Sequence, residues 1–324
     1  MAKQKLRQIA LVTLKLSVTA ALIYWLLSNA DFAAIGAMLS RVGAALFVTA
    51  IAVHITGSAF AAVRWWLLLK HTGVQVKLTE ILPSYYLGLF FNNVLPTGIG
   101  GDVVRALHLT RRGLSLKALA ASSIVDRAVG LLAMLIVGTA CAIFLPLGLD
   151  ATVRRSALIL LAGCIGGIVL VATPWAGAIL KWLQRHYHQT RVRHGILESA
   201  LMCYSYRSDP GLLIVAAVLS VIAQSLIILA YVLLGYGIGL SLPPAIYFVI
   251  IPLVFVAAML PISLGGLGVR EGALVGLLIA FGADRQLAIG LSLIYLFVLW
   301  MSTLPGAAVL FMRAPSGSQR STKS

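Results

Sequence analysis

Charged residues are scarce in this sequence, and acidic residues are the scarcest of them. Only 10% of the 324 residues are charged and 60% are hydrophobic, and 9 Asp and Glu residues stand against 25 Lys and Arg residues. A soluble domain carries about 25% charged residues, so water alone could not solvate the surface of this chain. The composition therefore excludes a soluble globular protein and favours an integral membrane protein.

Cysteines and catalytic motifs are equally sparse. The three cysteines, Cys141, Cys164 and Cys203, lie within or beside apolar segments with no metal-ligand spacing, and their odd number gives no disulfide framework. The glycine clusters lack the Gly-Lys-Ser/Thr of a phosphate-binding loop, and no nucleophile–base arrangement stands out. We therefore expect no enzyme activity, no metal and no cofactor.

The net charge of +16 could indicate a nucleic-acid partner, but the placement of the charges argues against it. The basic residues sit between apolar segments, where the positive-inside rule and anionic lipids account for them. We therefore expect membrane lipids, and no nucleic acid, as partners.

Long apolar runs dominate what remains. About 20 apolar residues span the hydrocarbon core as a helix. Six segments are predicted to be full transmembrane helices: Ile9–Ser28, Val42–Leu69, Ala118–Leu145, Ser156–Leu180, Gly211–Tyr236 and Leu287–Phe311. Two shorter stretches, Ile81–Leu95 and Ala245–Leu260, break at proline and glycines, and we expect each to form a re-entrant hairpin of half-helices. The predicted fold class is an all-α multi-pass membrane protein.

The distribution of basic residues predicts the orientation of the chain. With the N-terminus in the cytoplasm and both hairpins re-entrant, 20 of the 25 Lys and Arg residues fall on the cytoplasmic side. We therefore expect both termini in the cytoplasm. Residues 1–313 would form a single transmembrane domain, and residues 314–324 a disordered cytoplasmic tail.

The two broken segments repeat one pattern. Residues 95–105 and 260–270 both read L-P-x-x-x-G-G-x-x-V-R. Three predicted spans separate them, so the second hairpin would enter from the opposite side, as in transporters built from inverted repeats. We place one repeat at about 42–145 and the other at about 211–311.

Each break predicts a binding site for an anion. Proline ends the incoming half-helix, glycine permits a tight turn, and the next half-helix begins with free N–H groups and an arginine one turn later. The alternative is two kinked helices whose arginines reach the membrane surface. The residues assigned to the substrate site are Asn92, Asn93, Pro96, Gly100, Gly101, Asp102, Arg105, Asp126, Arg127, Pro261, Gly265, Gly266, Arg270 and Glu271.

Charged residues at membrane depth are functional candidates by default. For Asp126 and Arg127, structural ion pairing is the alternative. Asn92 and Asn93 would either supply amides to a lipid headgroup or cap the broken backbone.

Four segments also carry a family resemblance: 91–96, 100–105, 126–131 and 265–272. They resemble the lysylphosphatidylglycerol-synthase transmembrane-region family, also called the flippase-like domain family, over most of the chain. Bifunctional members fuse this region to a cytoplasmic aminoacyltransferase. This sequence carries no such domain, so the resemblance implies the lipid-translocating part and no synthase activity.

Together, the repeat and the resemblance predict a flippase in a bacterial inner membrane. It would translocate a polar or anionic phospholipid, glycolipid or hopanoid lipid, with Arg105 and Arg270 binding the anion, and a lipid-modifying enzyme is a second candidate partner. Asp102, Glu271, Asp126 and Arg127 would gate or couple the movement. Two alternatives stay open: a non-transporting protein that presents lipid to a membrane glycosyltransferase or lipid synthase, and an ion-coupled exporter of a small anion.

Overall fold

All regular secondary structure in the described part of the chain is helical. The computed structural model describes residues 2–95, 100–145, 151–186, 191–260, 262–263 and 265–311. Within these described ranges, four helices are long and apolar enough to cross a membrane: α2 (Phe32–His71), α5 (Leu116–Phe144), α9 (Pro210–Gly237) and α12 (Arg285–Ala308). The structure therefore supports the predicted fold class, an all-helical multi-pass membrane protein.

The remaining helices fall into three groups. Two pairs of short helices correspond to the predicted hairpins: α3 (Leu78–Val94) with α4 (Gly100–Thr110), and α10 (Pro244–Met259) with α11 (Val269–Ala280). The others are α1 (Ala2–Ser28), α6 (Ala151–Ala172), α7 (Pro174–His186) and α8 (Arg191–Ser205). Two 3₁₀ turns, η1 (Tyr206–Ser208) and η2 (Val309–Phe311), follow α8 and α12.

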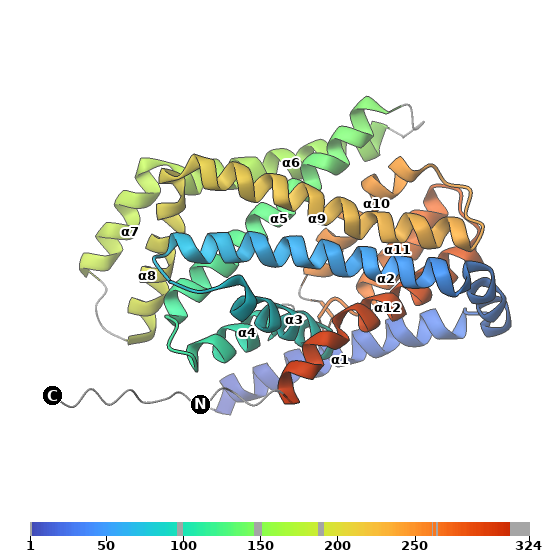
Figure 1. Cartoon of the computed structure of the whole chain (residues 1–324), viewed down its shortest axis with the longest axis horizontal. Coiled ribbons are helices and arrows are strands. Elements are labelled where there is room, and N and C mark those ends of the chain that lie inside the picture. The colour runs from blue at the N-terminus through green and yellow to red at the C-terminus, as the bar shows by residue number, and fades with distance from the viewer. Residues whose placement is uncertain are drawn as a thin grey trace.

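One predicted span is divided in the structure. The segment Ser156–Leu180 was expected to be a single helix, but α6 ends at Ala172 and α7 begins at Pro174. Proline lacks the N–H that would continue the α6 hydrogen-bond ladder, and its fixed φ suits the first position of a new helix. Figure 1 shows α7 and α8 running across the direction of the long helices at one end of the molecule.

Helix α2 is also interrupted, at its beginning. Gly43 has φ 67° and ψ 157°, which breaks the helical backbone and is favourable only for glycine. The predicted span, Val42–Leu69, coincides with the part of α2 that follows this kink. Asp31 starts the helix, since its carboxylate accepts hydrogen bonds from the backbone N–H groups of Ala33 and Ala34.

The two halves of the chain pack reciprocally. Helices α2 and α9 lie side by side along the centre of the molecule (Figure 1). The hairpin helix α3 packs on α12, and the corresponding helix α10 packs on α5. Likewise α5 contacts α9, and α12 contacts α2. Each half therefore supplies a hairpin to a long helix of the other half.

The two hairpins approach each other from opposite ends of the molecule. Figure 1 shows α3 and α4 in one half of the view and α10 and α11 in the other. At their meeting point, a Cβ atom added to Gly265 would lie 3.2 Å from the Leu95 carbonyl oxygen and 3.3 Å from that of Asn92. Pro96, Pro261 and the predicted tail, 314–324, lie outside the described residues.

Candidate functional site

Five charged side chains form a cluster where α2, α4 and α5 meet, which we call the first-hairpin cluster. Arg64 Nε donates to Asp126 Oδ1 over 2.7 Å. Arg105 Nη2 lies 3.1 Å from Asp102 Oδ1 and 3.8 Å from Asp126 Oδ2. Arg127 Nε donates to Asp102 Oδ2. Three guanidinium groups and two carboxylates leave the cluster with one formal positive charge.

Arg105 lies at the centre of this cluster and is enclosed by protein. Its guanidinium carbon lies 4.0 Å from the ring centroid of Trp65 and 5.1 Å from that of Tyr85, which is cation–π geometry. Its Nη2 also donates to Ser123 Oγ over 3.1 Å, while its Nε finds no hydrogen-bond partner among the described residues. In this conformation Arg105 could bind a headgroup only after one of its partners moved away.

Residues at the end of α3 and at the start of α4 fix the position of α4. The backbone N–H of Gly101 donates to Asn92 Oδ1 over 2.9 Å, so Asn92 caps the start of α4. Gly101 is buried directly against the Gly88 carbonyl oxygen, which brings α3 and α4 into backbone contact. Asn93 Nδ2 donates instead to Thr303 Oγ1 of α12 over 3.0 Å. Asn92 therefore connects the two helices of the first hairpin, and Asn93 connects this hairpin to α12 in the other half of the chain.

The second hairpin carries its own ion pair. Arg270 Nε and Nη2 both donate to Glu271 Oε1, over 2.9 and 2.5 Å. The other carboxylate oxygen of Glu271 accepts from the Gly268 N–H over 2.7 Å and caps the start of α11. Gly266 and Gly268 have φ values of 82° and 81°, which the turn before α11 requires. Glu271 is buried, so its carboxylate holds both the helix start and Arg270.

A small cavity lies where the two hairpins meet. Its volume is about 10 Å³, room for about one water molecule. Its lining residues come from both hairpins and from α12: Asn92, Asn93, Gly265, Leu267, Arg270, Leu296 and Trp300. The side chain of Arg270 is 19% exposed, against 5% for that of Arg105. Of these two arginines, Arg270 is therefore the one that already borders an open space.

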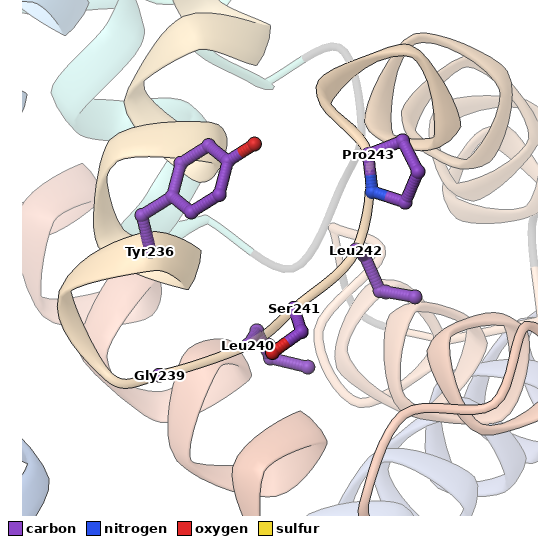
Figure 2. Close-up of a pocket in the computed structure, with 6 residues that line it drawn as sticks. All are labelled: Tyr236, Gly239, Leu240, Ser241, Leu242 and Pro243. Atoms are coloured by element: carbon purple, nitrogen blue, oxygen red, sulfur yellow. The ribbon is translucent and has the colours of Figure 1, made fainter.

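A larger pocket lies away from these charges, at the loop between α9 and α10. It has a volume of about 520 Å³, and Figure 2 shows the Tyr236 ring pointing toward the segment that carries Pro243. The residues lining it are Tyr236, Gly239, Leu240, Ser241, Leu242 and Pro243. None of these carries a charge, so we place the candidate site for an anionic ligand at the hairpins and not here.

A comparison with known families shows which family the chain belongs to. Residues 12–306 match the family described as the lysylphosphatidylglycerol synthase TM region. The chain belongs to this family. The match covers both hairpins and both sets of ion pairs, and it confirms the family predicted from the motifs. No curated protein and no solved structure shows significant similarity to the chain.

In this member of the lysylphosphatidylglycerol synthase transmembrane region family, one residue of the cluster was missed from the sequence. Arg64 is one of the 20 basic residues that the charge distribution assigns to the cytoplasmic side, and it was not named as a site residue, but it is 4% exposed and its Nη1 donates to Ser220 Oγ over 2.7 Å. The signal was present, because Arg64 lies inside a predicted span, where an arginine needs a partner.

Asp126 and Arg127 are adjacent in the sequence, but they pair with different residues. The ion pairs described above join Asp126 to α2 and α4, and Arg127 to α4 through Asp102. Within α5 these two successive residues project in different directions, so they reach different partners, whereas the adjacent Arg270 and Glu271 in the first turn of α11 do pair. By contrast, Asp102 and Arg105, one turn apart, do pair.

Proposed function

We propose that this protein is a flippase-like transporter that moves a polar or anionic lipid across a bacterial inner membrane. One observation carries the proposal: Arg270 converges with Asn92 and Asn93 on a cavity between the two hairpins. A guanidinium offers a planar pair of donors that matches a phosphate group, and side-chain amides add further donors. The membership in a lipid-related membrane family supports the same class of ligand.

The reciprocal packing of the two halves supports a transport mechanism. In transporters with inverted repeats, broken helices meet near the middle of the membrane, and one unit rocks against the other around a central site. Here α3–α4 and α10–α11 would be the moving hairpins, and α1 and α6 would join the four long apolar helices as spans. A cavity of about 10 Å³ admits no headgroup. We therefore infer that the hairpins separate before lipid enters.

The charged residues receive distinct roles under this proposal. Arg270 would contact the headgroup first, with Glu271 holding its guanidinium in place. Asp102 lies between Arg105 and Arg127, so a shift of Asp102 toward Arg127 would release Arg105 to bind the anion. The protein would act as a transporter, without catalysing a covalent step, and its partners would be membrane lipids and a lipid-modifying enzyme that makes or uses them.

Reconstituted transport tests the proposal. The purified protein is placed in liposomes with a panel of fluorescently labelled phospholipids and glycolipids, and lipid movement is followed by quenching of the outer leaflet. We expect Arg270→Lys to lose most of the transport, because lysine keeps the charge but not the two-pronged donor geometry. Arg285→Lys is the matched control, since Arg285 is at an exposed site and bonds only to Asn29 among the partners described for it.

Loss of folding must be separated from loss of binding. The double variant Arg270→Gln with Glu271→Gln removes both charges, so it leaves no unpaired carboxylate, and we expect it to be stable but inactive. Full transport by this double variant would disprove the role of Arg270. No transport of any lipid by the unaltered protein would favour the lipid-presenting alternative.

A further inference from the structure

Helix α7 presents three large apolar side chains that are each more than half exposed. Trp175, Ile179 and Trp182 are 79%, 56% and 52% exposed. Their spacing of four and three residues places them on one face of the helix. This face differs from the one that packs against the protein.

The opposite face of α7 is fixed to the rest of the molecule. Gly177 is buried against the ring of Tyr204 in α8, which allows the two helices to lie close together. Helix α8 is tied in turn to the start of α5 by an ion pair between Lys117 and Glu198. Because α7 is held on its inner side, its outer apolar face has a fixed direction.

The position of α7 identifies what this face meets. Figure 1 shows α7 crossing the direction of the long helices, at the end of the molecule where α1 begins. A short helix lying across the transmembrane helices at their ends is at the depth of the lipid headgroups. Tryptophan is enriched at that depth, because its ring is apolar and its N–H is polar.

The charge of this segment identifies the kind of lipid. The sequence of α7 and α8 contains four basic residues: Lys181, Arg185, Arg191 and Arg193. From Pro174 to Ser205 the single carboxylate is Glu198, and Lys117 already neutralises it. Clusters of Lys and Arg beside membrane helices attract anionic lipids.

We propose that α7 is an interfacial anchor that inserts Trp175, Ile179 and Trp182 into the headgroup boundary of a leaflet rich in anionic lipid. The positive charge that the sequence of this segment carries would draw it to the anionic leaflet. This inference concerns a surface distinct from the hairpin site, and it holds whether or not the protein transports lipid.

Site-directed spin labelling of the full chain tests the anchor. The three cysteines are replaced by serine, and one label is attached at Ile179→Cys or, as a control, at Ser208→Cys, an exposed site close in sequence to the end of α8. The protein is reconstituted in vesicles of phosphatidylcholine alone and of equimolar phosphatidylcholine and phosphatidylglycerol. Collision of each label with lipid-soluble oxygen and with a water-soluble nickel chelate is then compared.

We expect the label at position 179 to collide more with oxygen than with nickel, and the label at 208 to show the reverse. The label at 179 should also lie deeper in the mixed vesicles, and Lys181→Gln with Arg185→Gln should remove that difference. Equal access of nickel to both labels would overturn the anchor. Equal depth in the two vesicle types would overturn the preference for anionic lipid. Spin–spin broadening at 179 would show that a second copy of the chain covers this face and would overturn the proposal as well.

Discussion

At the scale of single residues, the first-hairpin cluster is an alternating chain of charges. It runs Arg64, Asp126, Arg105, Asp102, Arg127, so each carboxylate lies between two guanidinium groups. Burying an unpaired charge is strongly unfavourable, whereas a paired and hydrogen-bonded one is tolerated. The alternation therefore explains how three arginines can be held at a buried helix junction by only two carboxylates.

The variant Asp126→Asn tests this interdependence. It leaves Arg64 without its carboxylate and weakens the surroundings of Arg105, so we expect a loss of about 3–5 kcal/mol in stability, as for other broken buried pairs. Thermal unfolding in detergent, monitored by the burial of cysteine thiols, measures the loss. Adding Arg64→Gln to Asp126→Asn should recover part of it, because the unpaired charge disappears. Strictly additive effects of the two changes would show that the pair is not coupled.

At the scale of helices, the sequence predicted the elements better than their contacts. The broken segments Ile81–Leu95 and Ala245–Leu260 correspond closely to α3 and α10, because proline and glycine end a helix by local backbone chemistry. The partner of Arg64 could not be predicted in this way. It depends on α2 packing against α5 and α9, which are distant in sequence, and a single chain gives no direct sign of that packing. Pro174 by itself could have predicted the break between α6 and α7, but the apolar run around it favoured a single span.

Backbone contact between α3 and α4 makes Gly101 sensitive to the smallest substitution. A methyl group at Gly101 would overlap the Gly88 carbonyl oxygen and the Asn92 side chain, so Gly101→Ala must push the two helices apart. We expect a loss of roughly 1–3 kcal/mol in stability, together with loss of transport, because Arg105 would be displaced with α4.

The matched control for this prediction is Gly272→Ala in α11, the equivalent helix of the second hairpin. A Cβ atom at Gly272 meets no atom within 4 Å, and alanine favours a helix by roughly 0.5–1 kcal/mol over glycine. Gly272→Ala should therefore be neutral or slightly stabilising in the same unfolding assay. Similar stability for the two variants would contradict the close approach of α3 and α4.

At the scale of the whole molecule, the two halves share an arrangement but differ in chemistry. The reciprocal packing of α3 on α12 and of α10 on α5 is what two repeats related by a pseudo-two-fold axis predict. The first half holds the alternating chain of charges, whereas in the second half Tyr231 and Tyr295 stack with ring centroids 3.4 Å apart. The repeated sequence pattern pointed to the shared arrangement. Within the repeated segment it shows only that Asp102 stands where the second half has Leu267. It could not reveal the rest of the difference, because Arg64, Asp126 and Arg127 of the cluster, like Tyr231 and Tyr295, lie outside the repeated segment.

The orientation of the chain in the membrane can be tested at the two ends of α9, which we expect to lie on opposite sides of the membrane. Ser208 and Ser241 flank this helix, and both are exposed. In a cysteine-free background, Ser241→Cys should react with a membrane-impermeant maleimide added to intact cells, because the charge distribution places the end of α9 outside the cytoplasm. Ser208→Cys and Ser318→Cys should react only after the membrane is permeabilised. Labelling of Ser318→Cys in intact cells would rule out a cytoplasmic C-terminus, and labelling of both Ser208→Cys and Ser241→Cys from outside would show that α9 does not cross the membrane.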